Sequence, residues 1–487
     1  MTERGEAWKV VVRPMGAPLM GEGVAMLCCL VPALYYDDGT ASSIALSGLI
    51  TVAVGLLLTW LVPRRSSTDK RLSYVMVTLL WLTMALFGML PFLTTGSCSR
   101  LTDAFFETMS GVSSTGATIF SDVEMLPPSV LLWRSVLEWI GGFGIILLVL
   151  AIVPQLGLNK YSLYTAEMSG ADNTAKTTTT TRAMVQRTLS VYLILTLVFI
   201  VVLRLAGMNW WESVNLTFTN ISTGGFSVYG DSIARFTPLQ QYLLAASMFL
   251  GGINFVLLYN FFTFRWSKIR NKLDQFGFYV AMLVVSIAFV CVVLMQHHGL
   301  EWNDALRLSI VQITSVLTTT GSVVTDTNLW WTPVLFLMLI LSVCGGMAGS
   351  TSGGVKTMRV LILLRNVRNA LTNRLHPHAV NPVRLNGKPV SNDIITNVMV
   401  IFVVYAITMM MGFMALILTG VDATESLGAG FGCITSYGPG LGTCGGFGSY
   451  ADFPLVSKWI CSVLMLLGRL ECLTVYILLL PGFWRRH

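Results

Sequence analysis

The sequence predicts an all-α polytopic membrane protein with four similar helix–half-helix–helix repeats and two additional transmembrane helices at its N-terminus. The first observation is the composition: of 487 residues, 54% are hydrophobic and only 11% are charged. Soluble domains carry about a quarter of charged residues, so this chain is expected to lie in a lipid bilayer. The other two observations are a recurring polar loop and the acidic residue that precedes each copy of it.

The polar loop contains a glycine and recurs four times between apolar segments. Its copies read Ser-Thr-Gly-Ala from residue 114, Ser-Thr-Gly-Gly from residue 222, Thr-Thr-Gly-Ser from residue 319 and Ser-Tyr-Gly-Pro from residue 436. The glycines, which lie 108, 97 and 117 residues apart, are Gly116, Gly224, Gly321 and Gly438. The chain is therefore predicted to contain four similar repeats.

Long apolar segments set the boundaries of these repeats. The predicted divisions are an N-terminal helix pair in 1–71, repeat one in 72–155, repeat two with a preceding cytoplasmic linker in 156–272, repeat three with an interrupted last helix in 273–390, and repeat four in 391–487. The predicted membrane helices are 23–35, 43–62, 72–93, 130–152, 189–206, 239–263, 276–296, 330–364, 393–419 and 454–480. Ten crossings place both termini on the same side of the membrane.

Positive charge is concentrated in alternate connections between these helices. The connections 4–13, 64–71, 160–187, 265–272, 356–388 and 485–486 contain 24 of the 31 Lys and Arg residues. Because cytoplasmic connections are enriched in Lys and Arg, both termini are predicted to be cytoplasmic. The basic residues are dispersed along membrane edges instead of forming one patch, which argues against nucleic-acid binding.

An acidic residue opens a short helix 12 to 17 residues before each loop glycine. These residues are Asp103, Glu212, Asp304 and Glu425. Acidic side chains stabilise the first turn of a helix because the backbone dipole is positive there. A helix of about two to four turns cannot cross a hydrocarbon core of about 30 Å, so each is expected to enter the membrane and return. Non-helical backbone at that depth must be buried in protein or line a wet cavity, so we expect the four loops to surround one pore in a pseudo-fourfold arrangement.

The chemistry of the loops suits a dehydrated monovalent cation. Backbone carbonyl oxygens can replace the water of such an ion without supplying a full charge that would trap it. To direct successive carbonyls at one axis, the chain must adopt positive φ angles, which glycine does without a steric penalty. The four loop glycines are predicted to have this role. The C-terminal ends of the half-helices also favour a cation because the helix dipole is negative there.

A glycine-rich stretch interrupts the predicted helix 330–364. It holds five glycines and three hydroxyl residues, namely Gly345, Gly346, Gly349, Ser350, Thr351, Ser352, Gly353 and Gly354. Such a composition cannot hold a stable helix. We expect a mobile intramembrane loop that obstructs the pore and moves aside on gating. A kinked helix packed against its neighbours is the alternative.

Two charged residues, Arg469 and Glu471, occur in the last predicted helix. Charges inside a membrane are costly and usually face a pathway or each other. Residues at i and i+2 do not share a helix face. Arg469 is therefore predicted to face the pore below the loops, as part of the gate, and not to pair with Glu471. Glu138, which precedes a Trp-Ile-Gly-Gly stretch, is interpreted as a structural residue.

Two further patterns are less specific. The nine cysteines form no CxxC pair. Cys98, Cys433 and Cys444 fall on the outer side, where a disulfide is chemically possible. In the last long cytoplasmic connection, Asn-Gly at 386–387 favours a type I′ turn, and this segment is a candidate contact surface for a cytosolic partner.

In combination these features resemble the Trk/Ktr/HKT superfamily of potassium transporters, and most closely the TrkH/TrkG-type membrane subunit of bacterial Trk uptake systems. The resemblance covers nearly the whole chain. The motifs that carry it are Asp-Ala-Phe-Phe-Glu from residue 103, Ser-Thr-Gly-Ala-Thr from 114, Trp-Ile-Gly-Gly-Phe-Gly from 139, Gly-Ser-Thr-Ser-Gly-Gly from 349, Gly-Pro-Gly-Leu-Gly from 438 and Gly-Arg-Leu-Glu from 468.

The resemblance implies a homodimer with one pore per subunit, regulated by a cytosolic ring of NAD(H)- or ATP-binding subunits of the TrkA type. It assigns the potassium-binding filter to the loop glycines and the residues before them, namely Thr115, Gly116, Thr223, Gly224, Thr320, Gly321, Tyr437 and Gly438. A glycine at 116 is similar to the potassium-selective members. The fourth loop departs from relatives, which often have asparagines there.

Potassium uptake across a bacterial inner membrane is therefore the expected function, with K+ as the transported ion and no cofactor in this chain. The sequence contains no P-loop and no G-x-S-x-G motif, and an enzyme is not expected. The alternative is a secondary transporter of a small organic solute with broken transmembrane helices. That class shows two repeats, whereas four short loops occur here.

Overall fold

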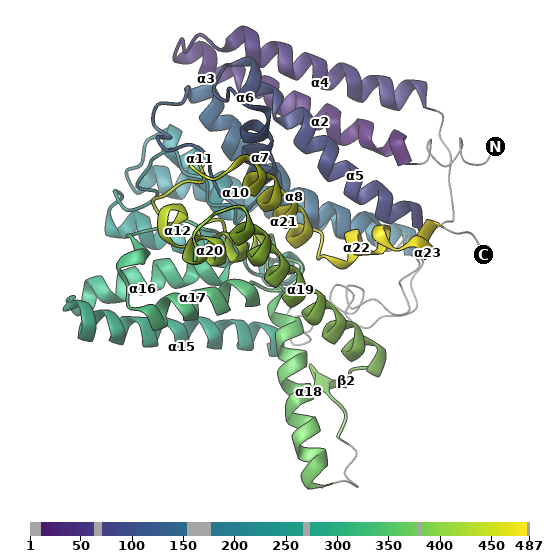
Figure 1. The fold of residues 1–487 in the computed structure, drawn as a ribbon, viewed down its shortest axis with the longest axis vertical. Helices are drawn as coiled ribbons and strands as arrows, with labels where there is room; N and C mark the ends of the chain where they lie inside the picture. Colours follow the sequence, from purple (N-terminus) through teal and green to yellow (C-terminus); the bar gives the residue numbers. More distant parts are fainter. Residues whose placement is uncertain (1–10, 63–70, 153–176, 266–272, 377–380, 485–487) are drawn as a thin grey trace.

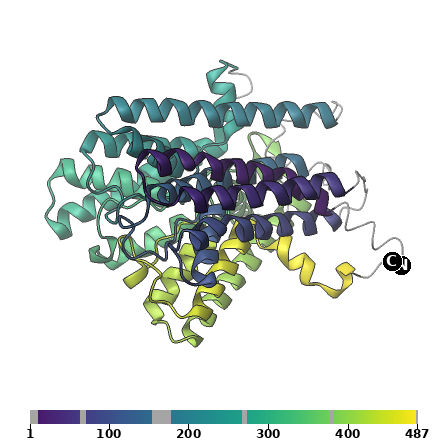
Figure 2. The same cartoon turned by 90° about the horizontal axis from the view of Figure 1, so that it is seen from above.

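The computed structural model describes residues 11–62, 71–152, 177–265, 273–376 and 381–484. Within these ranges the chain is helical apart from its connecting loops and one two-stranded hairpin. Most of the long helices run roughly side by side through the molecule (Figures 1 and 2). The all-α class predicted from the sequence is confirmed.

The elements are grouped by the predicted divisions, an N-terminal pair and four repeats. The pair comprises η1 (Arg13–Met15), α2 (Gly16–Cys28), α3 (Leu30–Tyr35) and α4 (Ala41–Leu61). Repeats one and two comprise α5 (Arg71–Gly88), α6 (Leu90–Thr94), α7 (Leu101–Val112), α8 (Pro128–Ile152), α10 (Thr177–Leu205), α11 (Trp210–Ile221), α12 (Pro238–Gly251) and α13 (Phe255–Phe262). Repeats three and four comprise α15 (Leu273–His298), α16 (Trp302–Leu317), η4 (Thr327–Leu329), α17 (Thr332–Cys344), α18 (Thr357–Leu375), β1 (Arg384–Leu385), β2 (Lys388–Pro389), α19 (Asn392–Leu418), α20 (Ala423–Thr435), η5 (Gly442–Cys444), α21 (Leu455–Arg469), α22 (Leu473–Leu479) and α23 (Pro481–Trp484).

Helices α2 and α4 lie against each other along one edge of the molecule (Figure 1). Glycines allow the close approach. A Cβ at Gly23 would lie 2.8 Å from the carbonyl oxygen of Gly48, and a Cβ at Gly16 would lie 2.6 Å from that of Gly55. Within a membrane, helices associate through van der Waals contact, and small residues let their backbones meet.

The four half-helices are α7, α11, α16 and α20. They contain 12, 12, 16 and 13 residues, which gives lengths of roughly 18 to 24 Å at 1.5 Å per residue. As predicted, Asp103, Glu212, Asp304 and Glu425 lie in their first turns. Asn209 and Glu212 also form a reciprocal capping box at the start of α11, which satisfies backbone N–H groups that have no partner within the helix.

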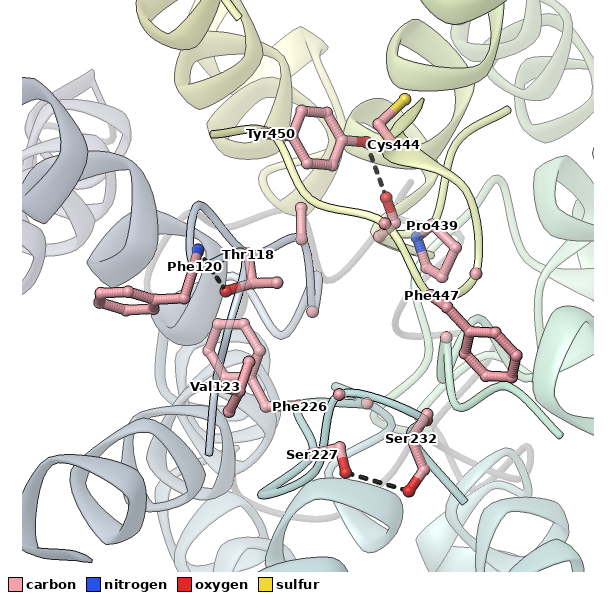
Figure 3. A pocket seen from close by; sticks show the side chains of 18 of the residues that line it. Thr118, Phe120, Val123, Phe226, Ser227, Ser232, Pro439, Cys444, Phe447 and Tyr450 are labelled. Carbon is pink, nitrogen blue, oxygen red and sulfur yellow. Dashed lines mark hydrogen bonds between the residues drawn. The ribbon is translucent and has the colours of Figure 1, made fainter. Parts of the chain in front are cut away.

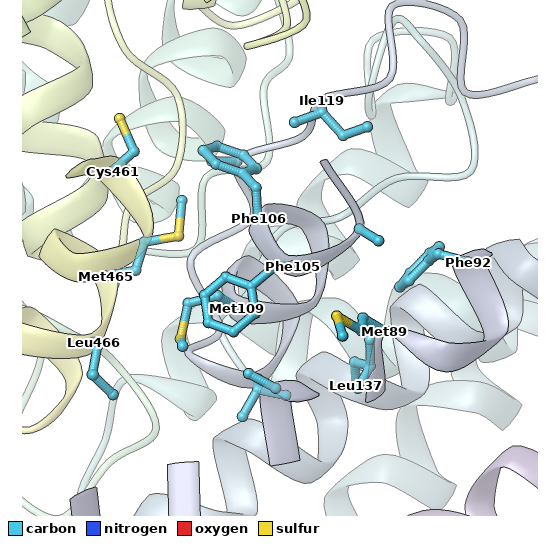
Figure 4. Packing of buried hydrophobic residues seen from close by; sticks show 14 of the residues in the cluster. Met89, Phe92, Phe105, Phe106, Met109, Ile119, Leu137, Cys461, Met465 and Leu466 are labelled. Atoms are coloured by element: carbon cyan, nitrogen blue, oxygen red, sulfur yellow. The ribbon is translucent and has the colours of Figure 1, made fainter. Parts of the chain in front are cut away.

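Half-helix α7 is buried on all sides between repeats one and four. Phe105, Phe106 and Met109 of α7 lie between Met465 of α21 and Leu137 of α8 (Figure 4). All nine residues from Ala104 to Val112 are buried. From Ala104 onwards, α7 is thus held inside the protein and does not face lipid.

Two helices predicted to be continuous are broken. The predicted helix 239–263 consists of α12 and α13, which meet at 106°, and the predicted helix 454–480 consists of α21 and α22, which meet at 111°. At the first break, residues of another repeat replace the missing helical hydrogen bonds: Met347 donates its N–H to the Gly252 carbonyl, and Phe255 donates to the Gly349 carbonyl. At the second break, Glu471 and Cys472 adopt φ angles of 59° and 52°. The predicted interruption of helix 330–364 is confirmed, because α17 ends at Cys344 and α18 begins at Thr357.

The described residues contain six helices that are long and apolar enough to cross a membrane, or eight if each bent pair forms one span. These eight correspond to eight of the ten predicted crossings. The other two predicted crossings are α8 and the interrupted α17–α18 pair. The boundary at 155–156 and most of the basic connections used to orient the chain lie outside the described residues.

The Asn-Gly turn predicted near the end of repeat three is confirmed. Asn386 and Gly387 join β1 to β2 with φ angles of 50° and 79°. Asp274 fixes the turn to the base of α15, because its carboxylate accepts hydrogen bonds from the Asn386 N–H at 2.9 Å and from Arg365 at 2.7 Å.

Replacing Gly23 by valine should destabilise the N-terminal pair. The new side chain would overlap the α4 backbone, and overpacking of this kind costs about 1–3 kcal/mol. Thermal unfolding of the detergent-solubilised protein measures the loss. The matched control is Gly21→Val on the same helix, where a Cβ meets nothing within 4 Å. Equal melting temperatures for the two variants would contradict the close contact of α2 with α4.

Candidate functional site

Each half-helix is followed by a turn with the same backbone conformation. A hydroxyl residue with φ between 51° and 55° is followed, two positions later, by a glycine with φ between 80° and 91°. The four pairs are Ser114 and Gly116, Thr223 and Gly225, Thr319 and Gly321, and Ser436 and Gly438. At the second position of each pair, only glycine adopts a φ of 80° to 91° without strain, which explains why a glycine recurs there.

The structure corrects the predicted register of the second turn. The left-handed glycine is Gly225, not Gly224, and Thr223 occupies the preceding left-handed position. Gly224 is required for another reason: a Cβ there would lie 2.3 Å from the carboxyl carbon of Glu138. The sequence could not separate the roles of two adjacent glycines, because only the tertiary contact with Glu138 distinguishes them.

The four turns touch one another in cyclic order. A Cβ at the left-handed glycine of each turn would collide with a carbonyl oxygen of the next turn, at distances of 1.9 to 2.3 Å. The pairs are Gly116 with the Gly224 oxygen, Gly225 with the Thr320 oxygen, Gly321 with the Tyr437 oxygen, and Gly438 with the Thr115 oxygen. The last pair returns to the first turn, so the contacts form a closed ring. We call these residues the turn ring.

One side of the turn ring opens into a pocket. All four left-handed glycines line it, together with residues that follow them in the chain (Figure 3). Thr118, Phe226 and Pro439 come from three different turns and surround the opening. Tyr229, at the rim, donates a 2.8 Å hydrogen bond to Glu212, and burial together with this bond raises the pKa of its phenol to about 12.

Neutral side chains support three of the four junctions between turns. The Tyr450 hydroxyl donates to the Gly438 carbonyl at 2.8 Å, and the Tyr450 N–H donates to the Thr118 carbonyl at 2.8 Å. Between turns two and three, the Ser322 hydroxyl donates to the Asn220 side-chain oxygen at 3.0 Å. Between turns three and four, the Gln312 side-chain amide donates to the Tyr437 hydroxyl at 3.2 Å. The side chain of the predicted filter residue Tyr437 is therefore buried in the protein, where its hydroxyl contacts Gln312.

A buried ion pair connects the segment that follows turn one to the segment that follows turn two. Arg134 and Glu107 lie 2.7 Å apart, and their side chains are 2% and 0% exposed. Glu107 also accepts the Ile119 N–H at 2.9 Å, while Arg134 donates to the Ser227 carbonyl at 2.9 Å and lies 4.1 Å from the ring centre of Phe226. This pair was not predicted from the sequence. The residue types were visible, but their pairing depends on the packing of α7 against α8.

The glycine-rich stretch 345–354 covers the other side of the turn ring. The Thr351 hydroxyl lies 3.2 Å from the Thr223 hydroxyl, and the Gly353 N–H donates to the Thr319 hydroxyl at 2.6 Å. A Cβ at Gly353 would lie 2.8 Å from the Cβ of Ser436. The stretch thus contacts the left-handed hydroxyl residues of turns two, three and four.

Arg469 completes this cover at turn one. Its guanidinium donates to the Thr351 carbonyl at 2.9 Å, the Ser114 hydroxyl at 3.3 Å and the Gly141 carbonyl at 3.0 Å. Arg469 is 4% exposed. Arg469, which was predicted to face the pore below the loops, thus contacts both turn one and the glycine-rich stretch. Glu471 pairs with Arg359 at 2.7 Å, as expected if it does not pair with Arg469.

The glycine-rich stretch is itself hydrogen-bonded and buried, and is not an open coil. Gly346 donates its N–H to the Ser352 hydroxyl at 3.1 Å, and the Ser350 and Ser352 hydroxyls lie 2.8 Å apart. Lys356 donates to the Ser352 carbonyl. Gly345, Gly349 and Gly354 have positive φ angles between 65° and 77°, which explains the glycine content.

The three outer cysteines do not form a disulfide among the described residues. Cys98, Cys433 and Cys444 are free thiols, and all three are buried. The described parts of the chain also contain no cluster of three His, Cys, Asp or Glu residues that could hold a metal ion.

The fold and the turn ring define a polytopic α-helical membrane protein with four half-helices that meet at one site. The TrkH family model, described as "Cation transport protein", matches residues 40–482. The chain therefore belongs to the TrkH family.

The chain is similar to several proteins of Trk systems. It is 32% identical over 488 residues to the "Trk system potassium uptake protein TrkH" of Vibrio parahaemolyticus, covering 98% of this chain and 99% of the relative. It is 30% identical over 486 residues to the TrkH protein of Escherichia coli K12, with the same coverage. The crystal structure of the potassium transporter TrkH from Vibrio parahaemolyticus matches with a TM-score of 0.87 at 30% identity, covering 98% of this chain and 100% of that one.

Replacing Arg134 by glutamine should strongly destabilise the protein. Removing one member of a buried ion pair leaves the other charge without compensation, at a cost of about 3–5 kcal/mol. The melting temperature in detergent reports this loss. Arg235→Gln is the control, because Arg235 pairs with Glu124 at the surface and exposed pairs contribute about 0–1 kcal/mol. A similar small effect for both variants would contradict the role of the Glu107–Arg134 pair.

Proposed function

We propose that this protein takes up K+ across the bacterial inner membrane through the turn ring, which acts as a selectivity filter. The observation that carries the proposal is the closed cycle of carbonyl–glycine contacts between the four turns. The names of the relatives, which are potassium uptake proteins of Trk systems, support it. An inside-negative potential of 100 mV contributes roughly 2.3 kcal/mol per charge, equivalent to about fifty-fold accumulation.

The chemistry of the ring favours a dehydrated monovalent cation. The residues that supply its carbonyls carry no charged side chain, and carbonyl dipoles can coordinate an ion without trapping it. Half-helices α7, α11, α16 and α20 end at the turns, so the negative ends of their dipoles lie next to the ring. We assign the filter to Thr115, Gly116, Gly224, Gly225, Thr320, Gly321, Tyr437 and Gly438.

The glycine-rich stretch 345–354 and Arg469 form the gate. They cover the side of the ring opposite the pocket, and they contact the left-handed hydroxyl residue of every turn. An ion that leaves the ring on this side must displace the stretch. The three glycines with positive φ supply backbone freedom for an alternative arrangement.

The charge pattern and the family support a proposal for the orientation and the partners. Both termini lie in the cytoplasm, and the pocket faces outward. The protein works as a homodimer with a cytosolic NAD(H)- or ATP-binding regulatory subunit of the TrkA type. The β1–β2 hairpin, which Asp274 anchors to the base of α15, offers a contact surface for this subunit.

A secondary transporter of an organic solute is the alternative function. Broken helices occur here, as in that class. However, both breaks lie beside the cover or the ring, and the four turns bring backbone carbonyl oxygens together, which are the ligands expected for a dehydrated cation.

Expression in a bacterial strain that lacks its own potassium uptake systems tests the function. We expect growth at low external K+ and uptake of the K+ analogue Rb+, both dependent on the membrane potential. Uptake of an organic solute without any Rb+ uptake would support the alternative instead.

Replacing Gly116 by serine should reduce the preference for K+ over Na+ by about ten-fold or more. The serine would be strained at a φ of 80°, and its Cβ would lie 2.1 Å from the Gly224 carbonyl oxygen. Growth under Na+ stress and competition of Na+ with Rb+ uptake measure the change. Gly230→Ser is the control, because Gly230 also lines the pocket and a Cβ there meets nothing within 4 Å.

Replacing Thr351 by valine should raise ion flux in the absence of the regulatory subunit. The variant keeps the side-chain volume but loses the hydroxyl contacts to Thr223 and to the Ile221 and Gly251 carbonyls, which hold the cover in place. Flux of 86Rb+ into liposomes that contain the purified protein measures the effect. Thr372→Val is the control, because the Thr372 hydroxyl bonds within its own helix, to the Arg368 carbonyl. Unchanged resting flux for Thr351→Val would argue that the stretch is a static packing element.

A further inference from the structure

The carbonyl group of Gly438, the left-handed glycine of turn four, is held by the protein. Its oxygen accepts a 2.8 Å hydrogen bond from the Tyr450 hydroxyl (Figure 3). The same oxygen lies against half-helix α20, because a Cβ at Gly432 would lie 2.7 Å from it. The Gly438 N–H donates to the Gly432 carbonyl at 3.0 Å. The peptide groups on both sides of Gly438 are therefore tied to neighbouring elements.

The carbonyl oxygens of the other three left-handed glycines, Gly116, Gly225 and Gly321, are not held in this way. Among the residues that the structure describes, no donor forms a hydrogen bond with any of these three oxygens. We call the carbonyl groups of the four left-handed glycines the glycine layer. A carbonyl group away from bulk water needs a partner, which a cation or its bound water can supply. Three oxygens of the glycine layer thus remain available to a cation, and the fourth is fixed.

Tyr450 is itself firmly placed. It is 2% exposed, and its ring packs against the rings of Phe106 in α7 and of Phe453, with centroids 5.3 Å and 5.1 Å away. Its N–H donates to the Thr118 carbonyl at 2.8 Å, which connects it to the segment that follows turn one. These contacts fix the position of the hydroxyl relative to both turns.

A proline follows the fixed carbonyl. The ring of Pro439 locks its own φ angle, and a Cβ at Gly321 in the neighbouring turn would lie 2.9 Å from the Pro439 Cδ. The segments that leave the other three turns continue with Ala117, Phe226 and Ser322, which carry no such restriction. Turn four is therefore the stiffest part of the turn ring.

We propose that Tyr450 is a positioning residue that sets the preference of the turn ring for large over small monovalent cations. A small ion such as Na+ needs oxygens closer to the axis than K+ does, so the ring must contract around it. The selectivity of a carbonyl site depends on its size and on the number of oxygens that it presents. Because Tyr450 holds the Gly438 oxygen beside α20, turn four cannot move inward, and the glycine layer keeps the width that suits K+.

This inference rests on the proposed function, because it requires a cation in the turn ring. The test replaces Tyr450 by phenylalanine, which keeps the ring contacts and the backbone N–H and loses only the hydroxyl. Inhibition of 86Rb+ uptake by Na+ is measured in proteoliposomes that contain the full-length protein. The Na+ concentration that halves the uptake should fall about ten-fold, an effect of the size that one hydrogen bond supports.

Tyr405→Phe is the matched control. Tyr405 is 4% exposed, and its hydroxyl donates to the Ile434 carbonyl at 3.0 Å. This variant therefore also removes one buried hydrogen bond to a backbone carbonyl in repeat four, but Ile434 lies within α20 and outside the turn ring. Inhibition by Na+ should stay as in the wild type. An equal loss of selectivity in Tyr450→Phe and Tyr405→Phe would overturn the positioning role of Tyr450.

Gly432→Ala disturbs the same carbonyl without altering Tyr450. The added methyl group would lie 2.7 Å from the Gly438 oxygen and 2.9 Å from the Pro439 oxygen, so the segment that leaves turn four must shift. Gly430→Ala on the same half-helix is its control, because the nearest atom to a Cβ there lies 3.7 Å away. We expect stronger inhibition by Na+ in Gly432→Ala and wild-type inhibition in Gly430→Ala.

The melting temperatures of the variants in detergent show which of them fold. Unchanged inhibition by Na+ in Tyr450→Phe would overturn the role of Tyr450 while leaving the proposed uptake function intact. If Tyr450→Phe does not fold, Gly432→Ala decides in the same way. Failure of the wild type to take up 86Rb+ at all would overturn the proposed function itself.

Discussion

The structure depends on the contact between a glycine of one turn and a carbonyl oxygen of the next. Any side chain at Gly116, Gly225, Gly321 or Gly438 would place its Cβ 1.9 to 2.3 Å from that oxygen. The half-helices must therefore end at a fixed depth and at a fixed spacing. If any one of the four turns moved, that turn would lose contact with the turns on both sides of it. Acidic first turns, buried half-helices and supporting hydrogen bonds all serve to hold these four contacts together. The membrane helices around them supply the rigid surroundings.

Much of this arrangement could be predicted from the sequence because it is encoded locally. Apolar composition defined the spans, acidic residues marked the starts of the half-helices, and three of the four left-handed glycines were identified correctly. These features depend on backbone propensity and on the membrane, and both act on short segments. The glycine-rich stretch and Arg469 were each predicted to lie below the loops as parts of the gate, because glycines and a charge are both unusual in an apolar helix.

Features that depend on contacts between repeats could not be predicted in the same way. The second turn contains two adjacent glycines, and only the proximity of Glu138 shows that Gly224 is needed for space and Gly225 for its φ angle. The breaks in 239–263 and 454–480 occur within continuous apolar sequence, where helix would be the default. Glu138 itself was interpreted as structural, because nothing near it in the sequence shows that it lies against a turn 86 residues later.

The break between α12 and α13 has a mechanical consequence. Met347 and Gly349 share backbone hydrogen bonds with Gly252 and Phe255, and the Asn254 side chain donates to the Ala348 carbonyl. If the covering stretch moved by itself, these groups would lose their partners in a region that water does not readily reach. Displacement of the stretch 345–354 therefore requires either that α13 moves with it or that α13 and α12 join into one continuous helix. In either case, movement of α13 in repeat two is coupled to movement of the stretch 345–354 in repeat three.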